Sequence, residues 1–168
     1  MAITDHTKGL GTTQGLNAAG VAQRHQEILA VCEVYAERIR LLEGLEVDIR
    51  ADVRLDLPDE ILSRMDIVIA SIHSAFGQSR EQITGRLVRT IHNPHVDVIG
   101  HPSGRLLGER QPYLVEWDDV FHAAAEHGVA LEINAFPNRL DLNDTLARAA
   151  VGSCSSWIAT RIRWSICR

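Results

Sequence analysis

Four side chains that could bind a divalent metal each follow a short apolar run of the chain: His6, Glu46, His73 and His101. The runs before His73 and His101 read DIVIASI and VDVIG, and such Val- and Ile-rich runs are typical of buried parallel strands. Residues just past the carboxyl ends of parallel strands meet at one face of a sheet. Because borderline divalent metals take imidazole nitrogen and carboxylate oxygen, the spacing predicts a metal site built from these four residues.

Taken singly, a histidine on an apolar element is more often a hydrogen-bonded structural residue than a ligand. Independent structural histidines are not expected to follow successive strands at the same end, so a metal site becomes as good an interpretation as a structural one. The other histidines lie on or beside predicted helices and are interpreted as surface or capping residues: His25, His92, His95, His122 and His127.

Cations in the neighbouring loops indicate an anionic ligand. Lys8, Arg105 and Arg139 each lie just beyond a predicted strand end. A guanidinium can grip two phosphate oxygens at once, and it would serve a carboxylate equally well. The alternative is that all three are solvated loop charges.

Two further polar residues lie on one face of a predicted strand. Glu132 and Asn134 alternate with apolar neighbours, so both would point into the same interior, which is costly unless they bind something. We expect Asn134 to contact substrate and Glu132 to support the metal ligands, with a plain buried polar network as the alternative. Asp5, next to His6, is also expected to support the ligands.

These residue types suit metal-assisted hydrolysis of a phosphoester. Divalent ions polarise the phosphoryl oxygen and lower the pKa of water, so no covalent nucleophile is needed. The serines near strand ends lack the context of a nucleophile elbow, and the chain has neither a GxxxxGK[ST] nor a GxGxxG phosphate loop.

The predicted elements alternate between strands and helices. Strands are expected at 41–49, 66–72, 96–100 and 129–134, and helices at 18–40, 60–65, 79–92, 117–127 and 141–150. The spacing of Ser79 and Gln82 predicts a capping box, and Gly128 a helix C-cap. This alternation predicts an α/β fold with a parallel sheet, either open or closed into a barrel.

Composition narrows the class of protein. The 168 residues are 45% hydrophobic, which fits one ordinary globular domain. A net charge of −5 argues against a surface that binds nucleic acid by charge alone. Three cysteines without a CxxC pair favour a reducing cytoplasm, and neither a secretion signal nor a membrane-spanning run is recognised.

The composition changes after residue 150. The segment 151–168 contains two of the three tryptophans, two of the three cysteines and no acidic residue. It is interpreted as an atypical tail, out of frame or disordered, following a domain over 1–150. The alternative is an authentic final strand and helix of unusual composition.

Five segments, in order along the chain, resemble the PHP (polymerase and histidinol phosphatase) domain, most closely the form attached to bacterial family X DNA polymerases. They are ITDHTKGLG, LEGLEVDI, DIVIASIHSAFGQSREQITGRL, NPHVDVIGHPSGRLLGER and ALEINAFPNRLDLND. The resemblance implies a distorted seven-stranded β/α barrel that carries up to three Zn or Mn ions. It also implies phosphoesterase activity: 3′ to 5′ exonuclease and DNA 3′-end processing in polymerase-linked members, and histidinol phosphatase in others.

The family motifs assign roles to individual residues. The matches to the family's metal ligands are His6 in Thr-Asp-His, Glu46 in Gly-x-Glu, His73 in Ser-x-His and His101 in His-Pro. The resemblance places Arg105 in the Gly-Arg loop, and Asn134 and Arg139 in the Asn-x-x-Pro-Asn-Arg segment, where substrate contact is expected.

The chain departs from the family at both ends. It lacks the opening strand with His-x-His and the closing strand with Asp-x-His. We therefore expect an incomplete barrel with two open edges that invite self-association, room for about one metal ion, and impaired catalysis. Two alternatives to DNA 3′-end processing remain open: a small-molecule phosphatase of the histidinol phosphate kind, and an inactive fragment or interaction module.

Overall fold

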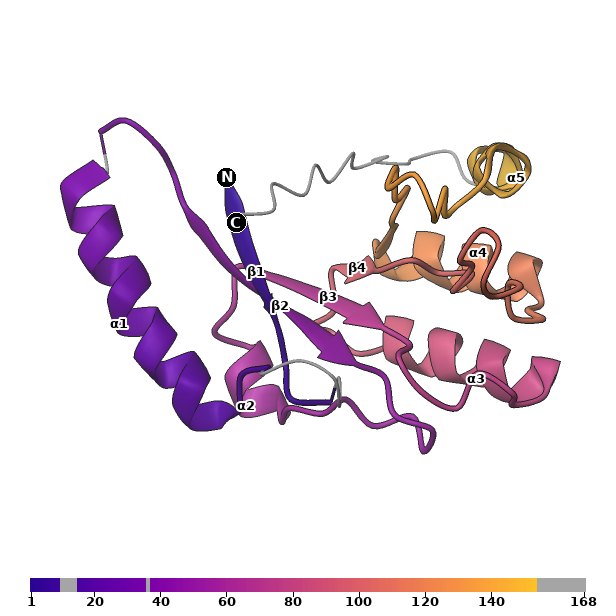
Figure 1. The fold of residues 1–168 in the computed structure, drawn as a ribbon, viewed down its shortest axis with the longest axis horizontal. Helices are drawn as coiled ribbons and strands as arrows, with labels where there is room; N and C mark the ends of the chain where they lie inside the picture. The colour runs from indigo at the N-terminus through magenta and orange to yellow at the C-terminus, as the bar shows by residue number, and fades with distance from the viewer. Residues whose placement is uncertain (10–14, 36, 154–168) are drawn as a thin grey trace.

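The computed structural model of this chain describes residues 1–9, 15–35 and 37–153. The elements alternate as predicted, in the order β1 (Ala2–His6), α1 (Ala18–Tyr35), β2 (Leu42–Asp48), α2 (Asp59–Leu62), β3 (Ile67–Ser71), α3 (Arg80–Ile91), β4 (Val98–Ile99), α4 (Trp117–His127), β5 (Ala130–Leu131) and α5 (Asp144–Ser153). In Figure 1, α1 flanks the β1 end of the sheet, and α3 and α4 lie side by side beyond β3 and β4. In the described residues, no helix is long and apolar enough to cross a membrane.

The five strands form one parallel sheet in the order β1-β2-β3-β4-β5. An α/β fold with a parallel sheet is therefore confirmed. The sheet is open within the described ranges, with β1 and β5 at its edges, rather than a closed barrel. Its register places His6 opposite Glu46, and Glu46 opposite Ile69, so the carboxyl ends of the first three strands lie together.

Strand β2 shows how the sheet separates its two faces. Leu45, Val47 and Ile49 are fully buried and belong to the hydrophobic core. Glu46 and Asp48 alternate with them, so their side chains project from the opposite face. The core side is covered by α3 and α4 through residues that include Ile83, Leu87, Ile91, Val120, Phe121 and Ala124. Each of the larger apolar side chains contributes about 1.5–3 kcal/mol through burial.

The helix ends follow the predicted capping chemistry closely. The Ser79 side chain accepts a hydrogen bond from the Gln82 backbone, and the Gln82 side chain accepts one from the Ser79 backbone, so the capping box is present. Gly128 ends α4 in the left-handed conformation, with φ of 70°. Helix α1 ends at Tyr35, five residues before the predicted end at residue 40.

The last predicted strand is shorter than expected, and the last predicted helix is displaced by three residues, because the residues between them bond to each other. The strand expected over 129–134 spans only Ala130–Leu131. Beyond it, Asn134 and Asp141 exchange backbone hydrogen bonds across a bend. Helix α5 consequently begins at Asp144, with Asn143 accepting a hydrogen bond from the Leu146 backbone. It runs through Ser153, and the remainder of the predicted tail lies outside the described residues.

Candidate metal centre

The ends of β1, β2 and β3 bring three of the four predicted ligands into one cluster. Ligand atoms of His6, Glu46 and His73 all lie within 4.8 Å of one another. His6 Nδ1 is 3.8 Å from Glu46 Oε2, and His73 Nε2 is 3.3 Å from Glu46 Oε1. Glu46 is thus the centre of the cluster, with one carboxylate oxygen facing each imidazole.

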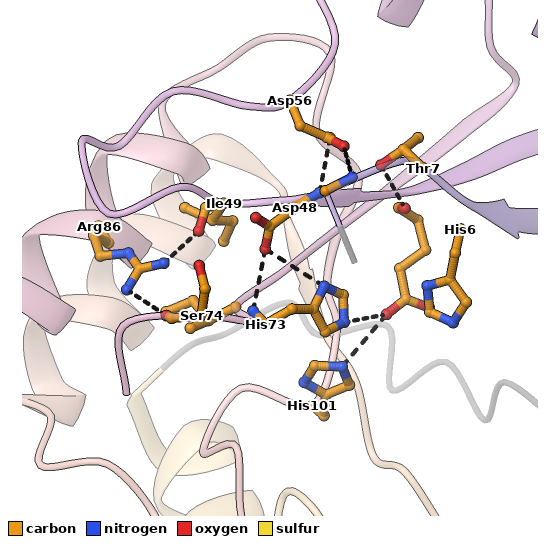
Figure 2. A network of polar contacts seen from close by, with 12 residues as sticks. His6, Thr7, Asp48, Ile49, Asp56, His73, Ser74, Arg86 and His101 are labelled. Carbon is orange, nitrogen blue, oxygen red and sulfur yellow. Dashed lines mark hydrogen bonds and ion pairs between the residues drawn. The ribbon is translucent and has the colours of Figure 1, made fainter. Parts of the chain in front are cut away.

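The fourth predicted ligand arrives from the loop after β4. His101 Nε2 lies 3.4 Å from Glu46 Oε1, the same oxygen that faces His73. The ring centroids are 5.6 Å apart for His6 and His73, and 5.1 Å apart for His73 and His101. In Figure 2, dashed lines mark the contacts that His73 and His101 make with this Glu46 oxygen, and the ring of His6 lies beside them. The structure therefore brings together all four side chains that follow the strand ends.

The position of His101 depends on an unusual backbone. Its φ is 29°, in the left-handed region that side chains rarely adopt. The buried Glu132 carboxylate accepts a hydrogen bond of 2.5 Å from the His101 backbone, which helps to hold this conformation. Gly100 precedes it, and a Cβ there would lie 2.3 Å from Ser71 Oγ, so only glycine fits. Glu132 therefore contacts His101 through the backbone N–H of that residue, and its expected role in supporting the metal ligands stays a prediction.

The charges of the cluster favour an ionised carboxylate. Burial acts to raise the pKa of Glu46, but hydrogen bonds from His101 and His73 and the nearby imidazole charges outweigh it and hold the pKa far below its usual value. Burial acts to lower the pKa of His73, yet hydrogen bonds and attraction from Asp48 and Glu46 raise it overall. The cluster therefore presents one anion among several imidazole nitrogens at neutral pH.

The donor set fits a divalent cation. Buried polar atoms in proteins are nearly always hydrogen-bonded. Yet His6 Nδ1, which faces Glu46, is buried without a hydrogen-bond partner among the described residues. Imidazole nitrogens with one carboxylate oxygen match the ligands that zinc and related metals prefer. The cluster could therefore hold a divalent metal.

One predicted supporting residue lies elsewhere. Asp5 does not turn toward the cluster but pairs with Arg24 of α1 at 2.6 Å. Adjacent residues of a strand point to opposite faces, so Asp5 and His6 cannot both face the cluster.

Sequence reasoning missed two acidic residues beside the cluster: Asp48 contacts His73, and Asp56 contacts Asp48. Asp48 Oδ1 accepts a hydrogen bond of 3.1 Å from the His73 backbone and lies 3.5 Å from His73 Nδ1. Asp56 accepts hydrogen bonds from the backbones of Asp48 and Gly9, both at 2.9 Å (Figure 2). The spacing of Glu46 and Asp48 was the available signal, because residues i and i+2 of a strand share a face.

The predicted phosphate-binding residues divide into two kinds. The Arg105 guanidinium donates to the backbone carbonyls of Arg139 and Leu140, so it braces a loop rather than facing an open site. Asn134 donates to Glu132 and accepts from the Phe136 backbone, which makes it part of the buried polar network that was the alternative interpretation. These contacts favour a bracing role for Arg105 and Asn134, and the substrate contact expected of both residues stays a prediction.

Lys8 and Arg139 keep polar groups that could meet a ligand. Lys8 is exposed and follows His6 by two residues. Arg139 is half-buried, and its Nη1 is buried without a hydrogen-bond partner among the described residues.

Comparison with known proteins gives relatives of two kinds. The DNA polymerase/3′-5′ exonuclease PolX of Bacillus subtilis is 46% identical over 142 residues, which are 84% of this chain and 25% of PolX. The predicted kinship with PolX is confirmed. A probable phosphatase of Caldanaerobacter subterraneus is 38% identical over 102 residues, or 58% of this chain and 38% of its own length. A probable phosphatase of Syntrophotalea carbinolica is 28% identical over 159 residues, or 93% of this chain and 58% of its own length.

The chain thus spans between a quarter and about three fifths of these relatives. No family model matches it. PolX and the probable phosphatases are nevertheless consistent with the PHP-domain family that the motifs resemble.

Proposed function

We propose that this chain carries a metal-dependent phosphoesterase centre of the PHP type, with His6, Glu46, His73 and His101 as the metal ligands. The observation that supports it best is the contact of one Glu46 oxygen with both His73 Nε2 and His101 Nε2, at 3.3 and 3.4 Å. A structural ion pair needs one histidine, whereas several imidazoles around one buried carboxylate match the ligand sets of divalent metals. The open sheet agrees with part of the barrel that the resemblance implies.

Zn or Mn is the proposed metal, because both take imidazole and carboxylate ligands. A divalent cation held there would supply Lewis acidity to a phosphoryl oxygen and to the attacking water. Glu46 provides the anionic ligand and stays ionised because its pKa is low. Lys8 and Arg139 are the proposed contacts for the negative charge of the substrate phosphate, since their cationic groups are not tied to the loops as that of Arg105 is.

The proposed substrate is a DNA 3′ end, since PolX has the highest identity of the relatives described and is named as a 3′-5′ exonuclease. A small-molecule phosphate monoester is the second candidate, favoured by the probable phosphatases, of which one matches 93% of this chain. Both reactions need the same metal centre and differ in the surroundings of the leaving group.

The metal content of the purified chain tests the first part of the proposal. We expect a bound divalent ion by elemental analysis after loading with Zn²⁺ or Mn²⁺, and a clearly lower content of bound ion in His73→Ala and His101→Ala. His122→Ala is the matched control, because His122 is exposed on α4. A chain that binds no ion, or variants that bind as the parent does, would overturn the proposal and favour an inert or interaction module.

Substrate profiling tests the second part. The loaded chain is given a 3′-labelled oligonucleotide and, separately, sugar and amino-alcohol phosphates. Release of 3′ nucleotides or 3′ phosphate supports DNA end processing, whereas release of phosphate from the small molecules alone supports the second candidate. Equal rates for the parent and for Glu46→Gln would assign either signal to a contaminant.

A further inference from the structure

Asp48 is a buried acid beside the proposed metal centre. It ends β2, two residues after Glu46, and is 4% exposed. One of its oxygens, Oδ1, accepts the His73 backbone N–H at 3.1 Å and lies 3.5 Å from the Nδ1 of the same residue. A single carboxylate oxygen thus contacts both the backbone and the ring of His73.

The contacts lie on opposite edges of the His73 ring. The Nδ1 edge faces Asp48, and the Nε2 edge faces Glu46 at 3.3 Å (Figure 2). A carboxylate that faces one nitrogen of a histidine ring favours the orientation in which the other nitrogen points away from it. Here the other nitrogen faces the Glu46 oxygen that also faces His101.

Asp48 is itself held firmly from two sides. Its backbone N–H donates to Asp56 at 2.9 Å, and its backbone carbonyl accepts from the Asp56 N–H at 3.2 Å. Gly9 approaches so closely that a Cβ there would lie 2.6 Å from Asp48 Cβ. The acid is therefore immobilised by the loops that follow β1 and β2.

Arg86 of α3 ties the two strand ends together. The residue is 1% exposed, and its guanidinium donates to the carbonyls of Ile49 and Ser74, the residues directly after Asp48 and His73. Figure 2 shows Arg86 reaching both segments from the helix side. One buried side chain thus fixes the spacing between Asp48 and His73.

We propose that Asp48 is the positioning residue of His73: it orients the imidazole so that Nε2 faces the cation position, while Asp56 and Arg86 hold Asp48 and His73 in register. The inference rests on the metal centre proposed above. Asp48 acts through His73 and is not itself a ligand.

A double-mutant cycle on metal affinity tests this role. Zn²⁺ affinity is measured for the full chain, for Asp48→Asn, for His73→Ala and for the double variant. Asp48→Asn is expected to weaken Zn²⁺ binding about 10–100-fold, the usual effect of losing a carboxylate behind a ligating histidine. In the His73→Ala background the same change is expected to have almost no further effect, because two residues that act through one contact are not additive.

Visible absorption with Co²⁺ gives a second measurement. We expect Asp48→Asn to alter the absorption bands of the saturated protein while the number of bound ions stays that of the parent. Asp52→Asn is the matched control, since Asp52 lies in the loop that follows β2, pairs with Arg54 and is exposed. It is expected to leave both affinity and spectrum unchanged.

Four results would overturn the inference. An unchanged Zn²⁺ affinity in Asp48→Asn, with the parent binding normally, removes the positioning role but leaves the metal centre intact. An additive loss in the double variant would show that Asp48 does not act through His73. If Asp48→Asn fails to fold, Asp48→Ser replaces it, and failure of both would make the role of Asp48 purely structural. A parent chain that binds no Zn²⁺ would instead overturn the proposed function together with this inference.

Discussion

Two polar regions follow strand ends in this protein, and they use similar residues for opposite purposes. At the ends of β1, β2 and β3, imidazoles gather around Glu46, and buried ring nitrogens lack hydrogen-bond partners within the described ranges. Around the loop after β5, the side chains of Arg105, Asn134 and Asp141 form hydrogen bonds with backbone groups. A polar side chain that follows a strand end is thus available to a ligand only where backbone groups do not already use its hydrogen-bonding atoms.

Replacing Glu46 is expected to produce the largest difference between the two regions. Glu46→Gln removes the anionic ligand, so we expect Zn²⁺ affinity to fall more than about 100-fold, beyond the loss for a residue behind a ligand. Arg105→Met, in the other region, should change Zn²⁺ affinity less than about twofold. Isothermal titration calorimetry measures both. A comparable loss in the two variants would mean that the regions form one site.

Replacing one arginine in each region should show which region contributes more to the free energy of unfolding. Arg86→Met leaves the Ile49 and Ser74 carbonyls without their buried donor, so we expect a loss of about 2–4 kcal/mol in the free energy of unfolding. Arg105→Met is expected to cost about 1–2 kcal/mol, because part of its guanidinium is exposed and water can replace it. Urea denaturation of metal-free protein measures both, and a larger loss at Arg105 would reverse the ranking.

The pH dependence of stability should have opposite signs at the two buried acids. The pKa of Glu46 is lowered, so its contribution is present above the unfolded value of 4.5 and is lost as the pH falls below it. Burial raises the pKa of Asp141 above 3.8, despite hydrogen bonds from Ser103, so stability is lost as the pH rises through the folded value.

The two isosteric amides should therefore diverge with pH. Relative to the parent, the unfolding free energy of Glu46→Gln should decrease as the pH rises, and that of Asp141→Asn should increase. Urea denaturation across the acid range, with chelator present, gives both slopes. Parallel slopes would refute the opposite electrostatic environments.

The smallest expected effect lies outside both regions. Ser79→Ala removes the N-cap of α3, which should cost about 1 kcal/mol of stability without changing Zn²⁺ affinity. Thermal unfolding and titration with Zn²⁺ measure the two quantities. A fall in affinity here would show that the cluster responds to general loosening of the fold, and the losses expected at Asp48 would then need the same explanation.

Local patterns accounted for much of the fold. The apolar runs predicted β2 and β3, and capping chemistry predicted the start of α3 and the end of α4, because these features depend on neighbouring residues. The shortening of β5 could not be predicted, since it results from backbone pairing between Asn134 and Asp141, seven residues apart. The barrel that the resemblance implies is likewise not closed within the described ranges.

The candidate site was anticipated in its members but not in its surroundings. His6, Glu46, His73 and His101 converge because parallel strands in register end together, which sequence order already implies. Their role as ligands stays a prediction. The surrounding acids were not anticipated correctly. Asp5 was expected beside the ligands but pairs with Arg24. Asp48, which was not expected there, faces His73.

By itself, the sequence determined which elements form and which residues follow each strand, because periodicity, capping and turn chemistry act over a few residues. Only the tertiary structure decided which polar groups remain unsatisfied. Arg105 found backbone partners in a distant loop and Asn134 found one in its own loop. Within the described ranges, the buried Nδ1 atoms of His6, His73 and His101 have no hydrogen-bond partner. Whether a polar side chain finds a hydrogen-bond partner depends on its neighbours in three dimensions. This difference distinguishes a side chain with a structural role from one that could bind a metal.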